Sequence, residues 1–89
     1  MKIQSRSFSI AGADHYQHSA PLKPGIELEL RREPENQYDT NAVSIWYVDK
    51  LGYIPRPMAV MLAPMIDSGQ VTVAAFYEQG ISIHLIITD

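Results

Sequence analysis

Residues 32–43 read Arg-Glu-Pro-Glu-Asn-Gln-Tyr-Asp-Thr-Asn-Ala-Val, and residues 51–56 read Leu-Gly-Tyr-Ile-Pro-Arg. The first stretch is a polar, proline-interrupted loop between two segments that have the composition of strands. Side chains able to meet a ligand crowd this loop: arginines at its entry, an aromatic ring, a carboxylate and amides. A simple turn has no need of the ring of Tyr38. The alternative is a stiff loop in which Asp39 and Asn41 cap their own backbone.

The segments on either side of the loop have the patterns of strands. Apolar and charged side chains alternate over residues 25–31, which indicates a strand with one buried face. Residues 43–48 are rich in β-branched and aromatic side chains, so they form the next strand, with Trp46 pointing outward. We expect a tight turn at Asp49-Lys50, followed by a short strand over residues 51–54.

Residues 57–67 carry the long helical pattern of the chain. Their apolar side chains recur at spacings of three and four, which is typical of an amphipathic helix. We expect its methionines in the core; the alternative is an adaptable binding surface. Pro57 suits the first helical position, where no N–H is needed. Pro64 lacks the N–H that a helix interior requires, so it predicts a kink or break near Leu62. Gly69 is expected to cap the end of the helix.

The remaining segments add three strands. Residues 3–12 form the first one, and residues 71–77 and 81–87 form a last hairpin around a turn that ends in Gly80. One helical turn is expected at residues 13–16. Short strands at this spacing predict a mainly β fold, a small closed or nearly closed barrel of about six strands with one main helix.

The composition is that of one small globular domain, spanning residues 1–89, with 46% hydrophobic residues. Cysteine is absent, which excludes disulfides, thiolate metal sites and cysteine nucleophiles. No signal peptide and no apolar stretch long enough to span a membrane are visible. We therefore expect a cytoplasmic protein without a membrane partner; the sequence does not indicate its oligomeric state.

The charge balance argues against a general nucleic-acid coat. Seven basic and ten acidic residues give a net charge of −3, whereas non-specific binding to a duplex needs many phosphate contacts. The basic residues are nevertheless concentrated, because Arg31, Arg32, Lys50 and Arg56 flank the loop and the 51–56 stretch. This distribution predicts a local positive rim that suits a short ligand better than a long duplex.

Little in the sequence supports catalysis. Asp14, His15 and His18 are the only cluster of metal-ligand types, and since their spacing matches no metal motif we interpret them as a polar loop. A nucleophile elbow and a phosphate-binding glycine loop are both missing. His84 is interpreted as the partner of a backbone group, and Glu33 as a solvated carboxylate. The prediction is a binding protein rather than an enzyme, with no catalytic residue, metal or cofactor.

Three side-chain types near the loop together suit recognition of a nucleic-acid end. The ring of Tyr38 offers a flat face on which a base can stack, worth roughly 1–3 kcal/mol. The carboxylate of Asp39 can accept a hydrogen bond from a sugar hydroxyl. The guanidinium of Arg56 can grip a phosphate with paired donors.

The pattern Arg-Glu-Pro-x-Asn-x-Tyr-Asp-x-Asn-Ala-Val, followed by Gly-Tyr-Ile-Pro-Arg, resembles the HIRAN domain family over about Pro24 to Gly69. That family occurs as an N-terminal module of Swi/Snf-type DNA translocases that remodel stalled replication forks. It also occurs as small bacterial proteins that stand alone, the form that this chain resembles. The resemblance implies a barrel similar to an oligonucleotide-binding (OB) fold.

The resemblance also implies a function, which is capture of the free 3′-hydroxyl end of single-stranded DNA, as in DNA repair. The implied DNA-binding residues lie in the 32–43 loop, at positions 52–56 and in the first loop: Tyr16, Arg32, Asn36, Tyr38, Asp39, Tyr53 and Arg56. Among them, Asp39 would meet the 3′-hydroxyl, Arg56 a phosphate, and Tyr16 a base. Two departures stand out, Asp14-His15-Tyr16 in place of a basic-aromatic-aromatic run and Gln37 in place of a proline.

Two classes of function follow from this reading. The first is a module that binds single-stranded DNA ends, alone or with a DNA-processing protein partner. The alternative is a protein-interaction or scaffold domain that keeps the fold without binding DNA.

Overall fold

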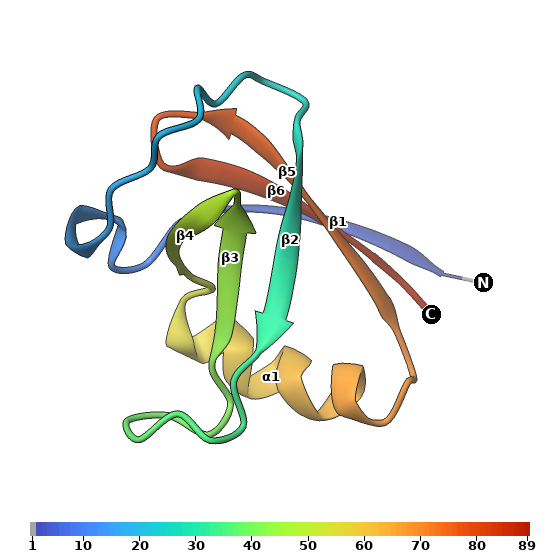
Figure 1. Ribbon diagram of the computed structural model, residues 1–89. Coiled ribbons are helices and arrows are strands. Elements are labelled where there is room, and N and C mark those ends of the chain that lie inside the picture. Colours follow the sequence, from blue (N-terminus) through green and yellow to red (C-terminus); the bar gives the residue numbers. More distant parts are fainter. Residues whose placement is uncertain (1) are drawn as a thin grey trace.

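The alternating segments of the sequence all form strands, and the mainly β prediction is confirmed. The computed structural model describes residues 2–89, and within them six strands, one α-helix and one 3-10 turn are present (Figure 1). The elements are β1 (Ile3–Ser9), η1 (Ala13–His15), β2 (Glu27–Arg32), β3 (Val43–Tyr47), β4 (Asp49–Tyr53), α1 (Arg56–Asp67), β5 (Thr72–Gln79) and β6 (Ser82–Thr88).

The strands form one antiparallel sheet that curls into a half-barrel similar to an OB fold. Its strand order is β1-β6-β5-β2-β3-β4, so β1 and β4 are its two outer strands. The two ends of the sheet nevertheless meet just after β1, where Ala11 and Tyr53 exchange backbone hydrogen bonds of 2.8 and 2.9 Å. The helix α1 lies beneath β2 and β3 (Figure 1). The barrel is therefore closed at one bridge and open along the rest of β1.

Closure at this bridge depends on Gly52. Its φ of 148° lies in the region that residues with a side chain rarely adopt. A Cβ atom at Gly52 would lie 2.5 Å from Ile10 Cγ2 and 2.6 Å from the carbonyl oxygen of Ala11. Only glycine lets β4 approach the end of β1 closely enough to pair.

A kink or a break was predicted near Leu62; the helix α1 runs continuously from Arg56 to Asp67, so the break is wrong. Pro64 removes only the hydrogen bond to the carbonyl group of Val60. Val60 is half exposed, so water can hydrogen-bond to that carbonyl group instead. The predicted glycine cap is confirmed. Gly69 N donates to Ile66 O (3.1 Å) and Gln70 N to Met65 O (3.0 Å), the paired bonds that end a helix at a left-handed residue.

The core lies between the concave face of the sheet and α1. Val43 and Ile45 are fully buried, and Tyr47 packs against the same cluster. Trp46 lies on the opposite face of β3 beside Ser44, as predicted; its indole N–H donates to Ser44 Oγ at 2.8 Å. The methionines fit the prediction only in part, since Met58 packs on the core while the side of α1 that carries Met61 is open to solvent.

Two local predictions are wrong. The turn between β3 and β4 is at Val48, which adopts a left-handed φ of 66°, and Asp49 and Lys50 already belong to β4. His84 contacts the hydroxyl groups of Ser5 and Ser7 rather than a backbone group. No helix within residues 2–89 is long and apolar enough to cross a membrane.

Candidate nucleic-acid interface

The loop between β2 and β3 is held in one shape by Asn36. The Oδ1 atom of Asn36 accepts hydrogen bonds from Tyr38 N (2.8 Å) and Asp39 N (3.1 Å), and its Nδ2 donates to Glu33 Oε1 (3.0 Å). Backbone bonds close the same loop, from Glu33 N to Ala42 O (2.9 Å) and from Ala42 N to Asp39 O (3.1 Å). The backbone positions from which the loop side chains project are therefore fixed.

The two carboxylate oxygens of Asp39 have different surroundings: one bonds to the loop backbone and the other faces the side chain of Arg56. Its Oδ1 accepts a hydrogen bond from Asn41 N at 2.9 Å, which caps the turn. Its Oδ2 lies 3.5 Å from Arg56 Nε, and the side chain is 20% exposed. The capping interpretation of Asp39 accounts for one oxygen and leaves the other facing the exposed guanidinium of Arg56.

Arg56 and Tyr38 line the same pocket as this carboxylate. The Nη2 atom of Arg56 donates to Tyr38 O at 2.9 Å, while the arginine side chain remains 67% exposed. Tyr38 itself is 86% exposed, so its ring is free on the surface. The acceptor oxygen of Asp39 thus has a cation beside it, and an exposed aromatic ring lies on the neighbouring residue.

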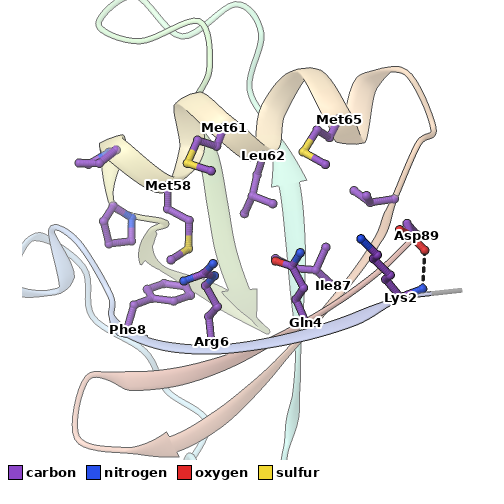
Figure 2. A pocket seen from close by; sticks show the side chains of 13 residues that line it. Lys2, Gln4, Arg6, Phe8, Met58, Met61, Leu62, Met65, Ile87 and Asp89 are labelled. Carbon is purple, nitrogen blue, oxygen red and sulfur yellow. Dashed lines mark hydrogen bonds between the residues drawn. The ribbon is translucent and has the colours of Figure 1, made fainter.

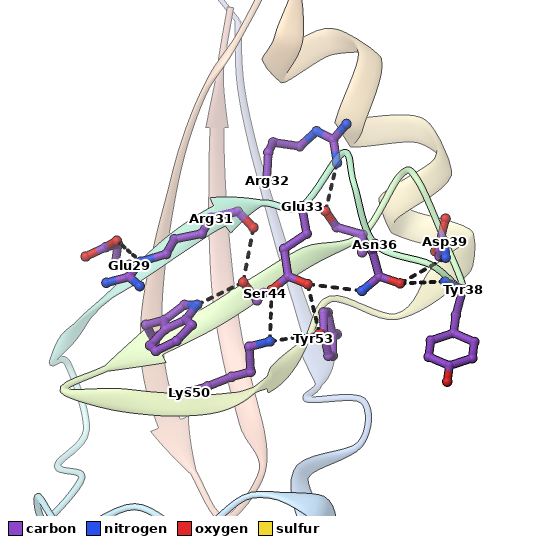
Figure 3. A network of polar contacts seen from close by, with 12 residues as sticks. Glu29, Arg31, Arg32, Glu33, Asn36, Tyr38, Asp39, Ser44, Lys50 and Tyr53 are labelled. Atoms are coloured by element: carbon purple, nitrogen blue, oxygen red, sulfur yellow. Dashed lines mark hydrogen bonds and ion pairs between the residues drawn. The ribbon is translucent and has the colours of Figure 1, made fainter.

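Glu33 joins the loop to β4, and the interpretation of Glu33 as a solvated carboxylate is wrong. Its Oε1 accepts from Tyr53 Oη at 2.9 Å and its Oε2 lies 2.9 Å from Lys50 Nζ (Figure 3). Burial disfavours the charged form, but hydrogen bonds from Lys50, Asn36 and Tyr53 outweigh it and hold the pKa of Glu33 at about 2. No pattern in the sequence marks a carboxylate as the centre of such a network.

Aromatic rings continue the surface away from the loop. The rings of Tyr16 and Tyr53 meet edge to face, with centroids 6.2 Å apart. The ammonium group of Lys50 lies 4.7 Å from the centroid of Tyr53, and the guanidinium of Arg31 lies 3.9 Å from that of Trp46. Cations over ring faces hold these aromatics in place.

These parts surround a pocket of about 540 Å³. Six of the seven residues expected to bind DNA line it: Tyr16, Asn36, Tyr38, Asp39, Tyr53 and Arg56. Arg32 does not line it. The guanidinium of Arg32 donates to both carboxylate oxygens of Asp67 at the end of α1, and to the carbonyl groups of Ala42 and Thr40. Arg32 ties the loop to the helix.

The predicted positive rim is not present as free charge. Arg31 pairs with Glu29 and Arg32 with Asp67; Lys50 pairs with Glu33 and Arg56 with Asp39. Pairs between distant segments, such as Arg32 and Asp67, cannot be seen in a count of basic residues. Of these four cations, Arg56 has the longest ion pair and the most exposed side chain.

The first loop shows no metal site in the described part of the chain. No group of three histidine or acidic side chains there could hold a metal ion. His18 instead contacts Ala20 O through Nδ1 at 3.0 Å, and Asp49 accepts from the N–H and hydroxyl groups of Ser19. These contacts anchor the loop that carries Tyr16.

The fold and pocket define a small OB-like binding domain. The family model of the HIRAN domain matches residues 3–82. The chain therefore belongs to the HIRAN domain family.

Solved structures share this fold. The crystal structure of the HIRAN domain of human HLTF superposes with a TM-score of 0.83 at 21% identity, covering 93% of this chain and 74% of that one. The NMR structure of the HLTF HIRAN domain in its DNA-bound conformation gives 0.66 at 21% identity, covering 94% and 72%. A protein from Lactobacillus plantarum gives 0.69 at 23% identity, covering 97% and 95%.

Curated relatives are much longer proteins. A putative SWI/SNF-related matrix-associated actin-dependent regulator of chromatin subfamily A member 3-like 1 from Arabidopsis thaliana is 46% identical over 73% of this chain. A Fanconi-associated nuclease 1 homolog from Oryza sativa subsp. japonica is 33% identical over 58%. The matched region spans only 7% and 6% of those two proteins, respectively.

Proposed function

We propose that residues 1–89 act as one binding domain that captures the 3′-hydroxyl end of single-stranded DNA in the pocket beside the β2–β3 loop. The observation that carries this proposal is the convergence of an exposed ring, a carboxylate oxygen and an exposed guanidinium on one pocket, at Tyr38, Asp39 and Arg56. The likeness to a HIRAN domain in a DNA-bound conformation supports the same ligand.

Binding requires one exchange of partners. The contact between Asp39 Oδ2 and Arg56 Nε is 3.5 Å long, and the arginine is largely exposed. Such a pair contributes little, roughly 0–1 kcal/mol, and the bond from Arg56 to Tyr38 O is exposed to water, so Arg56 can give up both contacts and turn toward a phosphate. Oδ2 is then free to accept a hydrogen bond from the 3′-hydroxyl. The other oxygen of Asp39, Oδ1, keeps its hydrogen bond from Asn41 N, so the turn stays capped.

The rings supply the rest of the binding energy. Tyr38 offers an exposed face to the terminal base, and Tyr16 and Tyr53 form a second aromatic wall of the same pocket. Stacking tolerates all four bases, so we expect little sequence preference. The hydrogen bonds of Asn36 and Glu33 hold the loop in shape before DNA arrives, which lowers the ordering cost of binding.

The test is a titration of short single strands that end in a 3′-hydroxyl or a 3′-phosphate, against wild type and Asp39→Asn. Asparagine keeps an oxygen for the turn but removes the charge, so the fold should be retained. A charge-assisted hydrogen bond is worth roughly 1.5–3 kcal/mol, so affinity for the 3′-hydroxyl strand should fall about tenfold or more. The gap between the two strands should narrow, because the repulsion of the phosphate is lost as well.

Arg56→Ala is the matched variant, since it should weaken both strands by a similar factor. Asp39→Asn protein that is folded and still prefers the 3′-hydroxyl by the wild-type ratio would remove Asp39 from the site. Wild-type protein that binds neither strand favours the second candidate, a protein-interaction domain without DNA binding. The ion pairing of the basic rim and the net charge of −3 are the observations on that side. In either case a DNA-processing protein is the proposed partner.

A further inference from the structure

The outer strand β1 leaves half of its backbone groups unpaired. Antiparallel neighbours exchange hydrogen bonds only at alternate residues. The bonds from Ile10 N to Ile81 O (2.7 Å) and from Asp89 N to Lys2 O (3.1 Å) show that the even-numbered residues of this segment bond to β6. The N–H and C=O groups of the odd-numbered residues therefore point to the outer edge: Ile3, Ser5, Ser7 and Ser9.

The outer edge of this segment pairs with another strand at one residue only among residues 2–89. Ala11 continues the odd-numbered series and pairs with Tyr53 of β4. Over Ile3–Ser9 no other strand of residues 2–89 pairs with the edge. An added extended segment could therefore pair with Ile3–Ser9, beyond the point where β4 pairs with Ala11.

An apolar groove of about 510 Å³ lies beside the free edge, between β1 and α1. The side chains of Met58, Met61 and Met65 point from α1 toward β1, and Phe8 points back from the strand (Figure 2). Met61 is 67% exposed, a large apolar side chain left open to water. Methionine side chains adapt to different partners, so such a wall accepts varied apolar groups.

The strand side of the groove is positively charged. Lys2 and Arg6 line it, with Gln4 between them (Figure 2). Within residues 2–89 neither side chain forms an ion pair, although the protein carries a net charge of −3 and its cations around the β2–β3 loop are all paired. One acid, Asp89, lies at the far end and accepts a hydrogen bond from Lys2 N at 2.6 Å. The middle of the groove, at Arg6, is left without a counter-charge.

We propose that this edge and groove bind an extended acidic peptide of a partner protein, which pairs with β1 as an added strand. Main-chain hydrogen bonds to the free edge provide affinity, and alternate side chains entering the groove provide selectivity. The groove-facing positions of the peptide alternate between apolar, against the methionines, and acidic, opposite Arg6 and Lys2. The groove shares no lining residue with the pocket assigned to DNA, so the proposal stands independently of DNA binding.

A second copy of this chain fits the edge less well. In an antiparallel pair of β1 strands the even-numbered residues of both copies lie on the same face. Each copy would bring Lys2 and Arg6 to that face, so self-pairing gathers four positive charges in one groove. An acidic peptide instead neutralises them.

The probe is a fluorescent peptide, Leu-Thr-Glu-Thr-Leu-Thr-Glu-Thr-Leu, which reads the same in both directions and so suits either strand orientation. Its leucines face Phe8 and Gln4 while its glutamates face Arg6 and Lys2. By anisotropy it should bind about fivefold or more tightly than the same peptide with lysine for glutamate, as exposed ion pairs allow. Arg6→Glu should abolish that preference, because either peptide then meets one like charge and one opposite charge at positions 6 and 2.

The backbone contribution is tested by Ser5→Pro with Ser5→Ala as its matched control. The N–H of Ser5 points away from β6, so proline removes no backbone hydrogen bond of the fold, and edge strands tolerate it. Both substitutions remove the contact of the Ser5 hydroxyl with His84, so alanine controls for that loss. Proline should weaken binding about tenfold, since it removes a donor and crowds the added strand, while alanine should leave it unchanged. The proposal would be overturned if folded wild-type protein did not bind the peptide, or if Ser5→Pro and Ser5→Ala changed its binding equally. Dimerisation that only Ser5→Pro abolishes would assign the edge to a second copy instead.

Discussion

Glu33 ties the β2–β3 loop to β4 through one carboxylate. Its two oxygens engage the loop through Asn36 and the strand β4 through Tyr53 and Lys50. A residue in this position sets where the loop stands relative to the aromatic wall of the pocket. Its ionisation state is therefore coupled to the stability of the folded protein.

The pKa of Glu33 predicts how acid destabilises the protein. The folded value of about 2 lies below the ordinary value of 4.5, so the charged form contributes stability that is present above pH 4.5. That contribution, on the order of 3 kcal/mol at most, is lost as the pH falls from 4.5 toward 2. Urea unfolding at pH 7 and pH 3 should show that Glu33→Gln removes this part of the pH dependence. A variant with the wild-type slope between those pH values would contradict the assignment.

Arg32 is expected to act on stability rather than on DNA. Lysine cannot reproduce its paired contacts with Asp67 and with two loop carbonyl groups. Arg32→Lys should cost about 1–2 kcal/mol, measured as a fall in Tm of roughly 5 °C or more. Arg31→Lys, at an exposed position, is the control and should stay within about 0.5 kcal/mol. A larger loss of DNA affinity for folded Arg32→Lys than for Arg56→Ala would return Arg32 to the binding site.

At the scale of the elements, the contact between the end of β1 and β4 decides whether the barrel closes. Gly52→Ala would place a Cβ against the carbonyl group of Ala11, which cannot move without breaking the bridge. We expect a loss of about 3 kcal/mol or more in the free energy of unfolding. Gly69→Ala is the control, because its φ is also positive but nothing lies within 4 Å of the added atom. Equal losses at the two positions would mean that backbone strain alone acts at Gly52.

The elements were predictable where burial dictates the pattern. Alternation along β2 and β6 reflects one face against the core, so the sequence located those strands within a residue or two. The helix was predicted with a break that does not occur, because a half-exposed turn tolerates the bond that Pro64 removes. The turn at Val48 was missed, because a β-branched residue is a rare choice for a left-handed φ.

The site was predictable where its residues lie in one loop and one short motif. Asn36, Tyr38 and Asp39 come from the same loop, Tyr53 is the last residue of β4 and Arg56 is the first residue of α1, and the pocket brings them together. What sequence reasoning missed were contacts across the fold. Arg32 bonds to Asp67, which lies 35 residues further along the chain, and Glu33 bonds to Lys50 and Tyr53. Such pairs depend on how the sheet curls, which alternation alone does not reveal.

At the scale of the whole molecule, charge is distributed in a way that limits how DNA can be held. Three of the four cations near the pocket are engaged by carboxylates at 2.9 Å or less, and Arg56 alone has a long, exposed contact. Binding that depends on Arg56 and at most one neighbour neutralises one or two phosphates. In the proposed complex, stacking and the 3′-hydroxyl contact would then carry most of the affinity.

This distribution predicts a weak response to salt. Each neutralised phosphate of a single strand contributes roughly −0.7 to the slope of log affinity against log salt, so we expect about −0.7 to −1.4. Arg56→Ala should make the slope shallower by about 0.7, the contribution of one phosphate, whereas Tyr38→Ala should lower affinity at every salt concentration and leave the slope unchanged, because stacking releases no counterions. Titrations of one strand across a range of salt concentrations measure both. A wild-type slope several times steeper would require a broad basic surface, and the ion pairing of Arg31, Arg32 and Lys50 leaves no such surface around this pocket.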